Sequence, residues 1–215
     1  AIAYYQQALK LNPDHIKTHQ NLGLIYQRQG TFQLAYQHFQ HIISLEPRNT
    51  DTYINLSHLF ILQNNLLSAQ NYLNEALKWE PKNAELHRLM GEIYQEEGDT
   101  ETAHSYYQLA LEIEKTSALK LKLATVLPTI VQSAHEIDDA LAHMQWELNK
   151  LSPETMPILD PLKQVQSSHF NIDYLCFESK KIKMLLYQIY EKLCPTLGFI
   201  ALHCQKPYPH TKIKI

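Results

Sequence analysis

Glycine and cysteine are scarce in this 215-residue chain, which has five glycines and three cysteines. No glycine-rich stretch has the spacing of a phosphate-binding loop, so the sequence predicts no nucleotide site of that kind. Cys176, Cys194 and Cys204 form an odd and unpatterned set. They do not predict a disulfide framework, and a reducing compartment is expected instead.

Charge of a single sign and long apolar runs are also missing. Lys and Arg number 19 against 22 Asp and Glu, a net charge of −3, so no basic stripe for nucleic acid or an anionic membrane is indicated. The apolar runs "LFIL" and "LGFIAL" fall far short of the ~20 residues that span a bilayer. The first residues also lack a charged-then-apolar signal segment. We therefore predict a soluble cytoplasmic protein without nucleic-acid or membrane partners.

What the sequence does contain is a repeating pattern, in which small, aromatic or large apolar, and proline positions recur at one constant interval. One half of the unit carries Ala1, Ala35, Ala69 and Ala103; Tyr5, Phe39, Leu73 and Tyr107; Ala8, Ile42, Ala76 and Ala110; and Pro13, Pro47 and Pro81. The other half carries Leu22, Leu56 and Met90; Gly23, Ser57 and Gly91; Tyr26, Phe60 and Tyr94; and Gly30, Asn64 and Gly98. The series breaks at Lys115.

Each residue class has a physical role in a helix–turn–helix unit. Small residues let two helices approach closely, and aromatic residues fill the space beside that contact. Gly30, Gly98 and Asn64 suit the left-handed conformation that ends a helix. Proline closes each unit because it disfavours helix at the residue before it. Such a unit cannot bury its apolar face alone and must stack on its neighbours.

The interval and these residues resemble the tetratricopeptide repeat. Residues 1–115 are expected to form a mainly α solenoid, with three complete repeats over residues 16–115. Residues 1–15 then correspond to the second helix of another repeat. We accordingly expect the chain to be a fragment, cut inside a repeat of a longer superhelix.

The resemblance places the first helix of each repeat on a concave face, where ligands lie. Asn21 in "HQNLGLIY" and Asn55 in "YINLSHLF" stand two positions before the small-residue site, whereas the third repeat has Leu89 there. A primary amide offers a donor and an acceptor, so it can pair with one peptide unit of an extended ligand. We predict Asn21 and Asn55 as peptide-binding residues, the alternative being that they are merely solvated.

Histidine pairs and charged residues raise two further possibilities, neither of which we predict. His15/His19 and His38/His41 have the spacing of one helical turn, but no carboxylate or cysteine completes a metal set. A basic clamp for acidic tails is disfavoured because acidic and basic residues mix along the first helices. These residues are Lys17, Asp51, Glu85, Arg88 and Glu92.

Residues 116–215 do not continue the repeating pattern. "TSALKLKLATVL" predicts a helix ending near Pro128, and "SAHEIDDALAHMQWELNKL" predicts another, with Ser133 and Glu136 in capping-box spacing. The expected buried face of this second helix is Ile137, Leu141, Met144, Leu148 and Leu151. "SKKIKMLLYQIYEKL" predicts a further helix, "HFNIDYLCF" an extended segment, and the terminal "TKIKI" a strand.

The motifs "KLATVLPTIVQSAHEI", "HFNIDYL", "IYEKLCPTLGFIALHC" and "KIKI" resemble, in order, the linker of the SPINDLY-type O-linked N-acetylglucosamine transferases. Leu175 and Leu202 depart from the pattern, where the family has His and Pro. The matching positions are Leu127, Pro128, Ile130, Ser133, Glu136, Ile137, Phe170, Tyr174, Tyr190, Cys194, Pro195, His203 and Cys204.

This resemblance implies that residues 116–215 are a mostly helical linker before a GT-B catalytic domain, ending in the first strand of an α/β lobe. The parent protein would transfer a sugar, GlcNAc in this family, from a nucleotide-sugar donor to Ser or Thr of acceptor proteins held by the repeats. Cofactor and catalytic residues would lie in the downstream lobes, so no catalytic residue is assigned here. The alternative function is a stand-alone repeat scaffold for protein–protein interaction.

Overall fold

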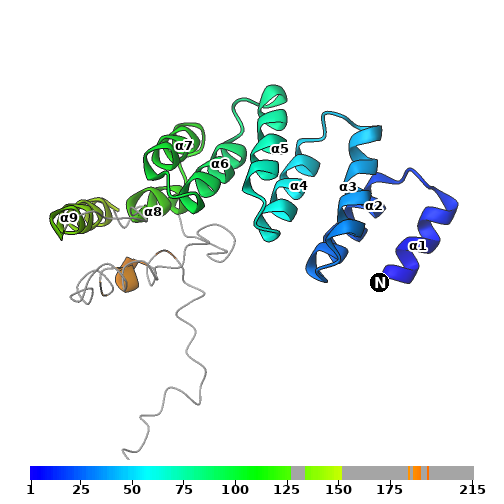
Figure 1. Ribbon diagram of the computed structural model, residues 1–215, viewed down its shortest axis with the longest axis horizontal. Coiled ribbons are helices and arrows are strands. Elements are labelled where there is room, and N and C mark those ends of the chain that lie inside the picture. The colour runs from blue at the N-terminus through cyan, green and yellow to red at the C-terminus, as the bar shows by residue number, and fades with distance from the viewer. Residues whose placement is uncertain (127–133, 152–183, 185, 190–192, 194–215) are drawn as a thin grey trace, which may run out of the picture. The chain divides into compact units, whose positions relative to one another are not determined.

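The computed structural model describes residues 1–126, 134–151, 184, 186–189 and 193. Its regular structure in these residues is helical (Figure 1). The described residues divide into two compact units, one spanning residues 1–115 and the other beginning at Thr116. No helix within these described residues combines the length and apolarity needed to cross a membrane.

The first unit consists of α1 followed by three helix pairs (Figure 1). The first helices of the pairs, here called A helices, start at one constant interval, and the second helices, here called B helices, start at the same interval. This confirms the predicted helix–turn–helix unit. The elements are α1 Ile2–Leu11; α2 Ile16–Arg28 with α3 Phe32–Leu45; α4 Thr50–Leu62 with α5 Leu66–Trp79; and α6 Ala84–Glu96 with α7 Thr100–Ile113.

The turn inside each pair has the predicted left-handed residue. The backbone φ angles of Gly30, Asn64 and Gly98 are 73°, 57° and 84°. In the first pair, the N–H of Thr31 donates to the Tyr26 carbonyl at 3.0 Å and that of Gly30 donates to Gln27 at 3.1 Å. These two bonds form the motif that commonly satisfies the last carbonyls of a helix, and both recur in the other two pairs.

The loops between repeats are closed by a ring at the fourth residue of each A helix. His19 Nε2 lies 2.7 Å from the carbonyl oxygen of Pro13, and His87 Nε2 lies 2.8 Å from that of Pro81. The Tyr53 hydroxyl donates to Pro47 at 2.9 Å. A carbonyl freed by the proline turn is thus satisfied in every repeat. Sequence reasoning missed this series, although the three rings recur at the same interval as the prolines.

A stacked ring pair links the A and B helices of each repeat. The ring centroids lie 5.6 Å apart in the first pair and 5.4 Å apart in the other two, with planes within 11° of parallel. These pairs combine the predicted aromatic position of the A helix with a ring twelve positions later. They are Tyr26 with His38, Phe60 with Tyr72, and Tyr94 with Tyr106.

The predicted close approach of the two helices is confirmed at the small residues. A Cβ atom added to Gly23 would lie 2.5 Å from Cε1 of Phe39, and one added to Gly91 would lie 2.7 Å from the Tyr107 ring. In the middle repeat the equivalent residues are Ser57 and Leu73, both fully buried. A larger residue on the A helix is therefore matched by a smaller one on the B helix, which keeps the packed volume similar.

The hydrogen bonding of one glutamine side chain differs between repeats, because the aromatic residue on the facing helix differs. Gln95 Oε1 accepts a hydrogen bond from the Tyr107 hydroxyl at 2.8 Å. The equivalent Gln27 Oε1 is buried without a hydrogen-bond partner among the described residues, because Phe39, at the position equivalent to Tyr107, has no hydroxyl. In the middle repeat both equivalent residues are apolar, so neither needs a hydrogen-bond partner.

The second unit contains α8 Ser117–Thr125 and α9 Ala134–Lys150. Leu141, Met144 and Leu148 are buried in one cluster with residues of α8, and Leu151 packs against it, as predicted. The side chains of Ser133, Glu136 and Ile137 lie outside the described residues. So do the predicted extended segment at 169–177 and the strand at 211–215.

Helix spacing continues past the point where the side-chain series ends. The first residue of α9, Ala134, follows the first residue of α7, Thr100, by one full repeat interval. Ser117, which starts α8, follows Ala84 of α6 by one position less than that interval. The side-chain series had indicated a break at Lys115, because the signature glycine and proline positions are absent beyond it. Backbone periodicity therefore outlasts the sequence signature.

Replacing Gly23 by Ala tests the close approach. We expect a loss of about 1–3 kcal/mol in the free energy of unfolding, because the added methyl group overlaps the Phe39 ring. The double variant Gly23→Ala/Phe39→Leu, which imitates Ser57 and Leu73, should lose less than the two single changes together. Urea unfolding of the four proteins measures this, and full additivity would contradict the steric explanation.

Candidate functional site

The A helices α2, α4 and α6 each have a face that is turned away from the B helix of the same repeat, here called the A-helix face. Gly23 contacts Phe39 of α3, so that side of α2 faces its partner. Asn21 is two positions away, which is about 200° around the helix axis. The same relation holds for Asn55 and Ser57 in α4. The predicted binding residues therefore lie on the side of each helix opposite to the close contact.

Asn21 and Asn55 are half-buried in the middle of their helices. Within the part of the chain that the structure describes, neither amide side chain takes part in a hydrogen bond. Their helices α2 and α4 contact each other, so the two amides sit at equivalent places on adjacent A helices. Each amide retains its donors and acceptor for a ligand.

Leu89 occupies the equivalent position in α6 and cannot extend the pair of amides. It is fully buried in an apolar cluster with Tyr53, Leu73 and Ile93. An amide at this place would be removed from water, which costs free energy unless it finds partners. The amide series therefore ends at Asn55, as the sequence indicated.

The cation on α6 is already paired. Arg88 is 7% exposed and donates to both carboxylate oxygens of Glu85, at 2.7 and 2.6 Å, and also to Glu92. Burial lowers the pKa of Arg88, but its bonds to Glu85 and the charge of Glu92 outweigh burial and raise the pKa above its ordinary value. Such a neutralised cation is poorly placed to clamp an acidic tail, in line with the sequence interpretation.

His58 of α4 is close enough to this ion-pair network for its charges to act on the imidazole. Burial lowers the pKa of its imidazole, and the positive charge of Arg88 lowers it further. The side chain is therefore neutral near pH 7 and adds no positive charge to the face.

Three histidines of the first repeat come together in space. His19 Nδ1 lies 2.8 Å from His38 Nδ1, and the His19 and His41 ring centroids are 4.3 Å apart. His41 Nε2 contacts Asp14 at 3.0 Å. His15, in contrast, caps α2 by accepting from the Thr18 backbone N–H. Among the residues that the structure describes, no group of His, Cys, Asp and Glu could hold a metal ion.

The contact between His19 and His38 depends on protonation. His19 donates from Nε2 to the Pro13 carbonyl, so in the neutral ring its Nδ1 is an acceptor and His38 must donate. If both rings were protonated, two N–H groups would face each other across 2.8 Å. Burial, followed by the charges of His19 and His41, lowers the pKa of His38. The cluster therefore favours the neutral form of His38.

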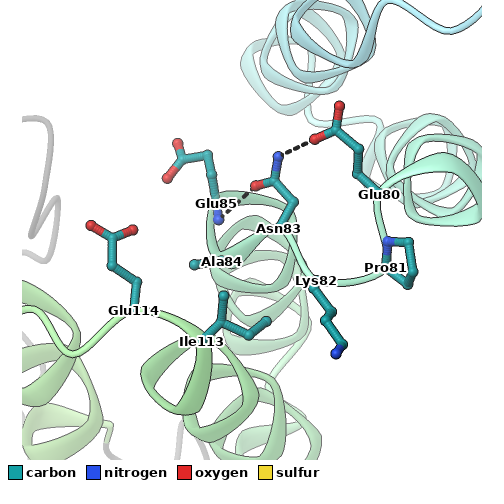
Figure 2. Close-up of a pocket in the computed structure, with 8 residues that line it drawn as sticks. All are labelled: Glu80, Pro81, Lys82, Asn83, Ala84, Glu85, Ile113 and Glu114. Atoms are coloured by element: carbon teal, nitrogen blue, oxygen red, sulfur yellow. Dashed lines mark hydrogen bonds between the residues drawn. The ribbon is translucent and has the colours of Figure 1, made fainter.

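A pocket of about 670 Å³ lies between the loop after α5 and the end of α7 (Figure 2). Figure 2 shows Asn83 between Glu80 and the start of α6, with the Ile113 side chain pointing toward Ala84. One repeat earlier, Trp79 lies beneath Arg48 at 4.6 Å and Thr50 donates to Glu80 at 2.7 Å. At the pocket, the smaller Ile113 and Ala84 occupy the positions equivalent to Trp79 and Thr50. This difference in side-chain volume explains the pocket.

Acidification should weaken the first repeat. Because the pKa of His38 is lowered in the folded protein, the unfolded chain binds the proton more readily. The contribution to stability is present above the ordinary imidazole value of 6.5 and is lost as the pH falls below it. We expect the Tm to drop between pH 7.5 and pH 5. Thermal melts should show a smaller drop for His38→Tyr, which copies the equivalent Tyr72 and Tyr106.

His104→Gln is the control for this comparison, since His104 lies on α7, outside the cluster. It should melt with the same pH dependence as the parent protein. Equal pH dependence of His38→Tyr and the parent would show that the imidazole pair does not limit stability in acid.

Comparison with known proteins addresses the repeats. Models of the tetratricopeptide repeat family match residues 1–30, 26–93 and 61–125, together more than half of the chain. No curated protein matches.

Solved structures with the same fold include a crystal structure of MamA, with 19% identity and a TM-score of 0.56 over 69% of this chain and 85% of that one. MamA 41-end from Desulfovibrio magneticus RS-1 has 14% identity and a TM-score of 0.56, covering 70% of this chain and 81% of that one. A thermophilic TPR protein of Thermus thermophilus has 23% identity and a TM-score of 0.53, covering 71% and 82%. The helix pairs, their constant spacing and the matching family models agree: over residues 1–125 this chain is a member of the tetratricopeptide repeat family.

Proposed function

We propose that this protein is a protein-interaction scaffold whose A-helix face binds an extended segment of a partner protein through Asn21 and Asn55. The observation that carries the proposal is the presence of two amides at equivalent places on adjacent A helices, neither bonded within the described chain. An amide that pairs with a peptide unit reads the backbone and not the side chains. The partner is therefore defined first by its extended conformation.

The strength of such binding is limited by the number of amides. Two side chains that make two hydrogen bonds each, at about 1 kcal/mol per bond, contribute roughly 4 kcal/mol, which corresponds to a Kd of about 1 mM. Leu89 prevents a third amide contact on α6. Tighter binding requires side-chain contacts of the partner elsewhere on the same face.

A narrower proposal, that the chain is the acceptor-binding and linker part of a protein O-glycosyltransferase, is supported by the ordered motifs between residues 118 and 215. Apart from Glu136 and Ile137 on α9, the positions that match the family pattern lie outside the described residues, and the repeat-family matches end at residue 125. Reading the coding sequence beyond Ile215 tests this proposal. A following nucleotide-sugar domain, with donor turnover by the extended protein, would support it, and an immediate stop codon would refute it.

Asn21→Ala and Asn55→Ala test the scaffold proposal. Each change removes about two hydrogen bonds of about 1 kcal/mol, so binding of an extended peptide should weaken about 30-fold. Fluorescence anisotropy with a partner-derived or library-selected peptide measures the affinity. Asn74→Ala on α5 is the matched control, because Asn74 is exposed on a B helix and should not alter binding. Unchanged affinity in both test variants would contradict the role assigned to the amides.

A further inference from the structure

The last residues of the three A helices form a second row, here called the end row, of Arg28, Leu62 and Glu96. All three are exposed, Leu62 to 59%. Neither Arg28 nor Glu96 takes part in an ion pair within the described residues. The row thus presents a cation, an apolar side chain and an anion in three consecutive repeats.

The end row lies on the same face as the amides. Arg28 follows Asn21 by seven positions, and Leu62 follows Asn55 by seven. Seven positions are two helical turns less about 20°, with a rise of about 10 Å. A peptide strand between the two rows can therefore bond the amides with its backbone while its long side chains reach the end row.

We propose, resting on the proposed function, that the bound segment carries an acidic residue for Arg28, an apolar residue for Leu62 and a basic residue for Glu96, one every third position or so. The spacing follows from two general dimensions. Packed neighbouring helices lie about 8–10 Å apart. A partner segment in the polyproline II conformation advances about 3.1 Å per residue with about three residues per turn, so every third side chain lies on the same side of it. One A helix therefore corresponds to about three residues of the partner.

Charge complementarity selects this occupant over an acidic tail or a basic segment. The only acidic side chain on α4 is Asp51, in the first turn and far from Leu62 along the helix, and α2 has no acidic residue at all. Arg88 is occupied by Glu85 and Glu92, so α6 presents no cation for an acidic tail. A segment of one charge sign would satisfy one end of the row and be repelled by the other.

The test uses seven-residue fluorescent peptides with Leu at the centre, polar uncharged residues between, and different end charges. The native protein should bind the peptide with Glu at one end and Lys at the other about fivefold more tightly than peptides with Glu at both ends or Lys at both ends. Because a strand can lie in either direction, the peptides vary the signs of the end charges and not their order.

Two protein variants should change this preference in opposite directions. Glu96→Lys makes the row positive at both ends and should favour the peptide with two Glu residues. Arg28→Glu makes it negative at both ends and should favour the peptide with two Lys residues. Leu62→Ser should weaken all three peptides, and circular dichroism should show unchanged folding, because all three positions are exposed.

The outcomes separate this inference from the proposed function. If all peptides bind equally to the native protein and both charge variants keep that equality, the end row does not select the partner. If Asn21→Ala and Asn55→Ala nonetheless weaken every peptide, the amide function remains and only the charge pattern fails. If no peptide binds at millimolar concentration, both the proposed function and the charge pattern are refuted.

Discussion

The structure depends on the close approach of the two helices in each repeat. At Gly23 and Gly91 there is no room for a Cβ atom beside the facing aromatic ring. This approach buries the Ala35, Phe39 and Ile42 face of α3 completely. Neither helix of a repeat has an apolar core of its own, so each apolar face is buried against the partner helix.

Contacts between repeats include several hydrogen bonds. Rings on the A helices satisfy the proline carbonyls, and Thr50 donates to Glu80 from the next loop. Tyr72 of α5 accepts a hydrogen bond from Gln40 of α3 at 3.0 Å, and its hydroxyl lies 3.3 Å from that of Tyr36. Polar partners at these places satisfy loop and helix-end groups that would be costly to bury alone.

The A-helix face changes in character along the array, and this shapes the proposed recognition. In the first two repeats it offers unbonded amides, whereas in the third the amide position is apolar and buried. On α6, Arg88 is paired with Glu85 and Glu92. In the proposed recognition, the backbone of the partner is bound by the amides in mid-helix, and its charge pattern is selected by the end row two turns later. Separating the two lets affinity and specificity vary independently.

Sequence periodicity by itself determined the repeats, their two helices and the turn residues, because each depends on local geometry. Gly30, Asn64 and Gly98 must adopt the left-handed conformation wherever the helix ends, and the small and aromatic positions repeat with the helices that carry them. The buried face of α9 was predicted correctly for the same reason, from the spacing of Leu141, Met144 and Leu148 along one helix.

Only the tertiary structure decided which polar groups are already occupied. The sequence placed Arg88 on a face of mixed charge, and the structure shows that it is paired with Glu85. The sequence spaced His38 one turn from His41, and the structure shows that His38 contacts His19 of another helix. Gln27 and Gln95 occupy equivalent positions in their repeats. Among the described residues, only Gln95 has a hydrogen-bond partner, because Tyr107 carries a hydroxyl group and the equivalent Phe39 does not. Availability of such a side chain depends on residues of a neighbouring helix, and packing brings these together in ways that a local pattern does not specify.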